Sequence, residues 1–355
     1  MPRILIPTLP EDAHATVAAT ALESLGVEAV LWCGAQFPAA QTQSVSIGDG
    51  HDFSWAVETA DDSFDGDGFD IVWARRIEPP ETPDHVHPDD RAFVARELEH
   101  YHSAIWNAIE PEAFWVNPLA AQRPANSKIC QLRQAESVGL AIPPTLVSNA
   151  PGKIRDFLER HRHRGTIYKG FYPATWEEDG RRLALPTRPV TLDDLPSDDM
   201  LQAVPGIFQA RIDKAFEVRL TMFGDHPIAA RIDSQAHSLG EEDWRMIHIA
   251  ELPVSFYRMP ASVLAKVRAF MRRLDIVFGC FDFIVEPDGA HVFLEVNQTG
   301  QWLWVEQAAP EILMLETFCR FLLHGRRDFD GTISSRPLRF RDHVEAVEQP
   351  ARQPG

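Results

Sequence analysis

One stretch near the C-terminal end of the chain constrains the fold most. Residues 281–297, FDFIVEPDGAHVFLEVN, form two strand-like runs joined by Pro, Asp and Gly. If Asp288 and Gly289 make a two-residue turn, as this dipeptide favours, Asp282 lies directly opposite Glu295. The pattern predicts a β-hairpin with two facing carboxylates on one side. The other side is then a wholly apolar core face, formed by Phe281, Phe283, Val285, Val292, Leu294 and Val296.

Two carboxylates on neighbouring strands repel each other unless a proton or a cation lies between them. Asn297, two residues after Glu295, points to the same side and adds a neutral oxygen. An all-oxygen set without His or Cys is typical of Mg²⁺ sites. The alternative is an acidic pair on a solvent-exposed sheet, and the hairpin alone does not decide between the two.

Two lysines stand where a phosphate could be bound. Lys169 lies in an apolar strand, IYKGF, and Lys128 lies at the start of a helix. A lysine ammonium binds phosphate as a flexible point charge. The alternatives are an edge-strand lysine that extends to solvent for Lys169 and a surface charge for Lys128.

A second hairpin is predicted from FEVRLTMF, residues 216–223, and PIAARIDS, residues 227–234, around Gly224 and Asp225. On its first strand Glu217 and Arg219 share one face. A two-residue loop would separate Arg231 from Arg219, and a longer loop would unite them. Converging arginines suit a site of phosphoryl transfer, whereas cross-strand Glu and Arg pairing is the alternative.

The rest of the chain predicts three units and a tail. Residues 1–122 form an α/β domain with strands at 3–7, 27–33 and 69–76 and helices near 13–25 and 88–109. No GxGxxG follows the first strand, which argues against a dinucleotide site. Residues 123–206 form a second unit whose part from 172 onward, rich in Pro, Asp and Glu, is predicted to be a mobile flap. Residues 207–325 form the last unit, and residues 326–355 are predicted to be a loosely held polar tail.

Charge and composition exclude two classes of partner. The chain of 355 residues has 34 basic and 52 acidic side chains, a net charge of −18. Without a basic stripe, nucleic-acid binding is not expected. No apolar run is long enough to span a membrane, and the four cysteines are widely spaced, so we expect a cytoplasmic protein with reduced thiols.

The order of these parts resembles the ATP-grasp superfamily, in particular its RimK-like branch of carboxylate-amine ligases. Shorter strings are similar to the microviridin-type, or graspetide, ligases that macrocyclise ribosomal peptides. These strings are WARR at 73–76, WVNP at 115–118, IDSQ at 232–235, DWR at 243–245 and NQTGQWLWVE at 297–306. The resemblance covers about residues 1–323. It implies an ATP-grasp fold of mixed α/β and α+β class, in which a pre-ATP-grasp α/β domain precedes two lobes that clasp ATP.

The resemblance also implies roles for individual residues. Lys128 and Lys169 would contact the ATP phosphates, and Lys169 would also lie near the adenine. Gln209 would meet the adenine amino group. Further nucleotide contacts would come from Ala210, Arg211, Ile212 and Glu217. Asp282, Glu295 and Asn297 would hold Mg²⁺, and Arg219 and Arg231 would neutralise the transferred phosphoryl group and the substrate carboxylate.

Asp243, Trp244 and Arg245 are candidate substrate contacts, with packing as the alternative for Trp244. One departure from the family concerns the segment after Lys169, GFYPATWEEDG, which lacks the small residues of a phosphate-covering loop.

The implied activity is an ADP-forming ligation. The carboxylate of an Asp or Glu side chain in a ribosomal precursor peptide, leader plus core, would be phosphorylated by ATP. It would then be joined to a Ser or Thr hydroxyl or a Lys amine as an ester or amide macrocycle. The leader is expected to dock on the strand pair at 216–235, and a homodimer is an option. Two alternatives stay open: a RimK-like ligase that acts on free amino acids, small peptides or a protein C-terminus, and a non-catalytic nucleotide-binding module.

Overall fold

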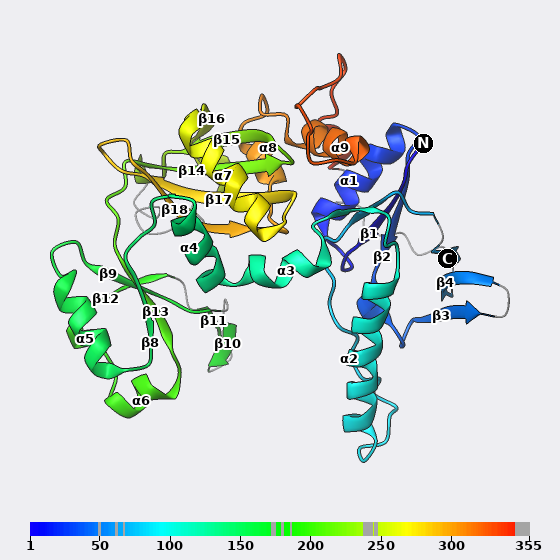
Figure 1. Ribbon diagram of the computed structural model, residues 1–355, viewed down its shortest axis with the longest axis horizontal. Helices are drawn as coiled ribbons and strands as arrows, with labels where there is room; N and C mark the ends of the chain where they lie inside the picture. The colour runs from blue at the N-terminus through cyan, green and yellow to red at the C-terminus, as the bar shows by residue number, and fades with distance from the viewer. Residues whose placement is uncertain are drawn as a thin grey trace.

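The computed structural model describes residues 1–48, 51–60, 63–66, 68–171, 175–178, 181–184, 187–236, 244 and 248–344. The N-terminal domain contains a parallel sheet of order β2-β1-β6-β7 (Figure 1). Its strands are β1 (Arg3–Pro7), β2 (Glu28–Trp32), β6 (Ile71–Trp73) and β7 (Phe114–Val116), and its helices are α1 (Ala13–Ser24) and α2 (Arg91–Ala108). The α1 helix begins where the Asp12 carboxylate accepts hydrogen bonds from the amides of His14 and Ala15.

The same domain has an antiparallel sheet that the sequence did not predict. Strands β3 (Gln41–Gly48), β4 (His51–Thr59) and β5 (Ser63–Asp65) pair in that order. The acidic, glycine-containing stretch DDSFDGDG at 61–68 favours a loop, but its residues Ser63–Asp65 form β5. Trp55 and Val57 of β4 are buried against Trp32 and Trp106, whereas β3 is mostly exposed and carries little apolar pattern to reveal it.

The central lobe is a small four-stranded sheet of order β12-β9-β13-β8. The strands are β8 (Thr145–Ser148), β9 (Thr166–Lys169), β12 (Arg188–Val190) and β13 (Gly206–Ala210), with α5 (Pro151–Arg160) and α6 (Asp198–Ala203) packed on one face. Strands β10 (Thr175–Glu178) and β11 (Arg181–Ala184) form a separate hairpin. The flap predicted at 172–206 is therefore too long, because Val190 and Leu201 anchor β12 and α6 in the lobe's own core.

The largest sheet has five antiparallel strands in the order β16-β15-β14-β17-β18. They are β14 (Phe216–Phe223), β15 (His226–Ile232), β16 (Val254–Tyr257), β17 (Phe278–Val285) and β18 (His291–Asn297). One face packs against α7 (Ala261–Leu274) and against α3 (Leu119–Asn126) and α4 (Lys128–Ser137). Seven of the eight residues of β14 are buried, whereas only three of the seven residues of β15 are, so the leader dock expected on strands 216–235 stays a prediction.

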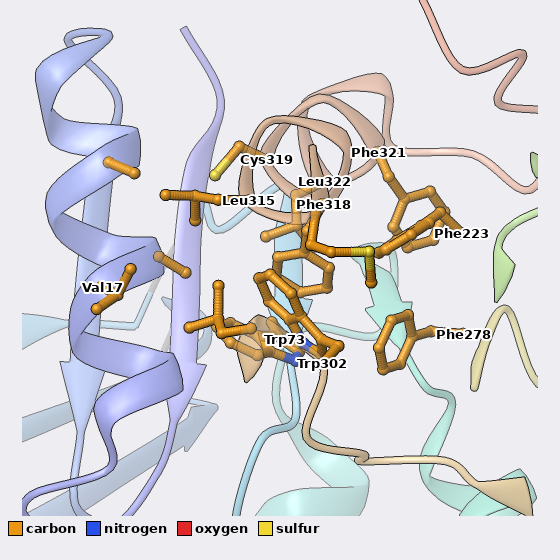
Figure 2. Close-up of a cluster of buried hydrophobic side chains, with 14 of the residues drawn as sticks. Val17, Trp73, Phe223, Phe278, Trp302, Leu315, Phe318, Cys319, Phe321 and Leu322 are labelled. Atoms are coloured by element: carbon orange, nitrogen blue, oxygen red, sulfur yellow. The ribbon is translucent and has the colours of Figure 1, made fainter. Parts of the chain in front are cut away.

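A shared hydrophobic core joins the N-terminal domain to the large sheet. Helices α8 (Leu303–Ala308) and α9 (Met314–His324) pack between them, and Figure 2 shows the aromatic centre of this core. The Phe318 ring lies 4.5 Å from the rings of both Trp73 and Trp302. Asn117 adds a buried polar link. Its Nδ2 donates to the Phe278 carbonyl at 2.9 Å, and its Oδ1 accepts a hydrogen bond from the Phe278 amide at 2.8 Å. These two units are thus held as one body.

The described part of the tail, residues 326–344, is held against the core and is not loose as predicted. Glu316 is fully buried, and its carboxylate accepts the backbone amides of Ser334 at 2.7 Å and Leu338 at 3.0 Å. Glu306 likewise accepts the amide of Phe340, at the start of α10 (Phe340–His343). Buried carboxylates need such donors, and the tail supplies them. Within the described residues, no helix is long and apolar enough to cross a membrane.

Candidate active site

The carboxylate hairpin is formed by β17 and β18, and Asp282 pairs with Glu295 as predicted. The turn differs from the prediction. The Gly289 amide donates to the Glu286 carbonyl, and Gly289 has a φ of 88°, so the loop has three residues. A β-bulge after Asp282 shifts the register by one residue and compensates for the longer loop. The predicted pairing is therefore confirmed although the predicted turn is wrong.

The bulge changes which side chains share the face of the two acids. Val292 now pairs with Ile284, and both pack with Leu294 and Ile212 in a small apolar cluster. The prediction that Val292 and Leu294 lie on the core face is thus wrong. Strand β18 presents an apolar half followed by a polar half that ends in Glu295 and Asn297. Such a surface suits a ligand with an apolar ring at one end and charge at the other.

Asp282 forms an ion pair with Arg219 on the neighbouring strand. The Arg219 Nη1 lies 2.7 Å from the Asp282 Oδ1, and the Arg219 Nη2 donates to the Gln301 carbonyl at 2.9 Å. Burial lowers the pKa of Arg219, but the charge and hydrogen bond of Asp282 together with the charges of Cys280 and Glu295 more than offset this, and the pKa is raised overall. Arg219 is therefore a fixed positive charge beside the carboxylate pair.

Of the two predicted lysines, Lys128 lies near Glu295 and contacts the residue that follows Lys169. The Lys128 Nζ donates to the carbonyl of Gly170, the residue after Lys169, at 3.1 Å and lies 4.0 Å from the Glu295 Oε2. Lys169 lies on the opposite face of β9 from Tyr168, which packs in the lobe's core. Lys128 thus places a positive charge where the end of β9 approaches the large sheet.

The residues of this face fit a magnesium ion. Among the described residues, no group of three or more His, Cys, Asp or Glu side chains could hold a metal ion. The candidate magnesium ligands are therefore two carboxylates, Asp282 and Glu295, and one amide, Asn297. The side chains of Asp282 and Glu295 are 19% and 32% exposed. The Asn297 Oδ1 accepts the Thr299 amide at 3.1 Å, which fixes its direction. This all-oxygen set leaves positions for water and phosphate, as Mg²⁺ prefers.

Gln209 gives the matching observation for a nucleotide base. Its side chain is buried, its Nε2 donates to the Thr145 hydroxyl at 3.0 Å, and its Oε1 has no hydrogen-bond donor within the described part of the chain. A buried acceptor without a donor is costly, and an amino group of a ligand would satisfy it. In the hinge at residues 210–212, which connects β13 to the large sheet, the amides of Ala210 and Arg211 donate to the carbonyls of Pro144 and Gly165, so these two amides are already used within the protein.

Glu217 lies two residues before Arg219 on the same face of β14. It is buried and accepts hydrogen bonds from Lys214 at 2.9 Å and Ser234 at 2.8 Å. Burial raises its pKa, and Lys214 opposes that rise. These bonds fix the carboxylate beside the hinge, where its role as a nucleotide contact remains a prediction.

Arg231 is not brought to this face, although the resemblance implied that it acts together with Arg219. The loop at Gly224 and Asp225 has two residues, so Phe223 pairs with His226 and Arg231 pairs with Val218 on the opposite face. There the Arg231 guanidinium stacks over Phe216 at 4.0 Å and bonds Asp233. The sequence left both loop lengths open, and the structure selects the one that separates the two arginines.

Of the three substrate contacts predicted from DWR, the structure describes Trp244. Asp243 and Arg245 lie outside the described residues. The Trp244 ring packs 4.6 Å from the Trp304 ring at the edge of the shared core, as the packing alternative predicted. Arg75 and Arg76 belong to the string WARR, but no role was predicted for either residue. The structure places both beside the loop that follows Asn297.

Together, the two antiparallel sheets, the α/β domain before them and the acidic and cationic groups on one strand face define an ATP-grasp fold. The search of solved structures supports this class. A RiPP-associated ATP-grasp ligase from Chryseobacterium gregarium, in complex with ADP and a leader and core peptide, matches with a TM-score of 0.83. It is 24% identical, over 93% of this chain and 99% of that one.

Two further structures carry the same likeness. The macrocyclase MdnC from Microcystis aeruginosa, bound with precursor peptide MdnA, has a TM-score of 0.79 and 25% identity over 91% of this chain and 99% of its own. The macrocyclase MdnB of the same organism has a TM-score of 0.75 and 27% identity over 92% and 100%. No protein-family model and no curated protein matches the sequence. The predicted resemblance to ATP-grasp ligases of ribosomal peptides is confirmed.

Proposed function

We propose that this protein is an ATP-dependent ligase that forms ester or amide macrocycles in a ribosomal precursor peptide. The observation that carries the proposal is the face of β14, β17 and β18, where Asp282 lies between Arg219 on one neighbouring strand and Glu295 on the other. The structural neighbours that bind ADP with a leader and core peptide, or a precursor peptide, support the choice of substrate.

The chemistry needs activation because oxide is a poor leaving group from a carboxylate. Transfer of the γ-phosphoryl group to the substrate carboxylate gives an acyl phosphate. Attack by a hydroxyl or amine on its carbonyl carbon then expels phosphate, and the nucleophile loses its proton. No covalent bond to the enzyme is required.

The chain's residues divide this work by position. Ile212, Ile284, Val292 and Leu294 would seat the adenine, with the Gln209 Oε1 accepting from its amino group. Lys128 and Lys169 would bind phosphates. Asp282, Glu295 and Asn297 would hold Mg²⁺, which would offset the negative charge of the phosphates. Arg219 would stabilise the charge that develops on the transferred phosphoryl group.

The proposal includes a cytoplasmic location, which supplies the ATP and suits the four free cysteines. The test is to incubate the purified protein with ATP and Mg²⁺, first with free amino acids and then with a synthetic precursor peptide. We expect ADP formation with the peptide and the loss of one water per ring by mass spectrometry. Dehydration of small substrates alone would favour the RimK-like alternative, and ATP binding without ADP formation would favour a non-catalytic module.

A further inference from the structure

Two consecutive arginines after β6 extend from the N-terminal domain to the loop that follows Asn297. The Arg75 guanidinium pairs with the Asp12 carboxylate at 3.1 Å and donates to the Thr299 carbonyl. The Arg76 Nη1 donates to the Thr299 hydroxyl at 3.1 Å. That hydroxyl lies 3.3 Å from the Asn297 Oδ1. Arg76 is thus two hydrogen bonds away from a member of the proposed magnesium set.

Arg75 and Arg76 differ in their exposure and in the N–H donors that they can offer to a ligand. The Arg75 side chain is 2% exposed and is held by protein groups, whereas the Arg76 side chain is 33% exposed. Arg76 lies 4.0 Å from Asp12, whose carboxylate is closer to Arg75. A guanidinium group has five N–H donors. Arg76 is therefore positioned at one edge and retains donors for a ligand.

The loop at residues 299–301 lies between two cationic groups of different origin. Arg76 contacts it at Thr299 from the N-terminal domain, and Arg219 contacts it at Gln301 from the large sheet. His14 adds no charge here, because burial and then Arg75 lower its pKa to about 3. Since the β14–β15 register removes Arg231 from this face, a second arginine beside Arg219 must come from another element.

We propose that Arg76 binds the carboxylate of the substrate's acidic side chain, and that Arg75 is a positioning residue that holds the Arg76 backbone and Thr299 in place. This rests on the proposed function, since it names the residue that recognises its acyl donor. A substrate carboxylate must approach a negatively charged phosphoryl group in a protein of net charge −18. A planar guanidinium fork offsets that repulsion and orients both carboxylate oxygens.

A consequence of this assignment is selectivity for acids over amides. Asp and Glu side chains offer two acceptor oxygens to the fork, whereas Asn and Gln offer one and present a donor in place of the other. Arg76 should therefore discriminate between a peptide with its acidic residues and the same peptide with amides. A purely structural role at the domain boundary would give no such discrimination.

The test compares Arg76→Gln and Arg76→Lys with a matched control, Arg96→Gln, at an exposed position on α2. The probes are the synthetic precursor peptide used to test the proposed function and its variant with every Asp and Glu replaced by Asn and Gln. For Arg76→Gln we expect KM for the acidic peptide to rise about 10- to 100-fold. Binding of ADP and of AMPPNP should change by less than about twofold.

The binding preference for the acidic peptide over its amide variant should be lost in Arg76→Gln and partly kept in Arg76→Lys. An unchanged KM and preference in Arg76→Gln would overturn the assignment while leaving the proposed function standing. A loss of AMPPNP affinity as large as the change in KM would also overturn it, because Arg76 would then serve the nucleotide phosphates. If the wild type forms no ADP with the peptide, the proposed function fails, and the role of Arg76 fails with it.

Discussion

Replacing Asp282 with alanine should stop ADP formation and also destabilise the fold. The first effect follows from the loss of a proposed Mg²⁺ ligand. The second follows from the ion pair, because the Arg219 guanidinium is 7% exposed and would lose the carboxylate 2.7 Å away. Glu295→Ala removes the other carboxylate, which is more exposed, and should therefore affect activity without the same loss of stability.

The expected loss in the free energy of unfolding follows from the burial of the charged side chains. Breaking a buried ion pair by removing one partner costs about 3–5 kcal/mol. Asp282 is itself 19% exposed, and Arg219 keeps its bond to the Gln301 carbonyl, so we expect the lower end, about 3 kcal/mol. For Glu295→Ala we expect less than about 1 kcal/mol, because its side chain is 32% exposed and Lys128 lies 4.0 Å away.

Urea unfolding, monitored by tryptophan fluorescence without nucleotide or Mg²⁺, measures the free energy of unfolding separately from ADP formation. The control is the double variant Arg219→Met with Asp282→Ala, which removes both charges and should recover most of the lost stability. Equal unfolding midpoints for wild type, Asp282→Ala and Glu295→Ala would refute the argument about the ion pair. Full ADP formation by Asp282→Ala would refute its role as a metal ligand.

Three further predictions concern other parts of the molecule. The stability due to neutral, buried His14 should be complete above pH 6.5 and decrease as pH falls toward its lowered pKa of about 3. The slope should be roughly 1.4 kcal/mol per pH unit, and His14→Gln should flatten it in urea titrations. Gln209→Leu should weaken ADP binding about tenfold in calorimetry with little change in unfolding. Glu316→Gln should cost about 2 kcal/mol, because one oxygen that accepts a buried amide is lost, and trypsin should then cleave residues 326–344 faster.

The hairpin shows how far local sequence patterns can predict a site. The alternation of charged and apolar residues correctly predicted that Asp282 lies opposite Glu295. It did not predict the three-residue loop, although Pro287 suits the second position of a type I turn and Gly289 suits its end. The bulge has no such local signal, because its cause is the packing of Leu294 with residues of β17 and the hinge.

Other features depend on partners that are distant in the sequence. The sequence of β15, the strand of Arg231, fits either length of the loop before it. The pairing of β15 with β16 and the stacking of Arg231 on Phe216 accompany the two-residue loop. The tail has few apolar residues, and it is ordered because Glu306 and Glu316 are buried beneath it. Arg75 and Arg76 share one strand end, but only the approach of the loop at Thr299 distinguishes their surroundings.

The shared core of the N-terminal domain and the large sheet also limits how the enzyme can open. The core residues of β6, α1, β17 and α9 form one packed cluster, whereas β8, β9, β12 and β13 have a smaller core of their own. The chain enters this smaller unit past Pro143 and Pro144 and leaves it at residues 211–215. We expect the central lobe to rotate as a rigid unit about these two connections, while the N-terminal domain and the large sheet stay fixed. Nucleotide exchange would then leave Arg76, Arg219 and the metal ligands in place.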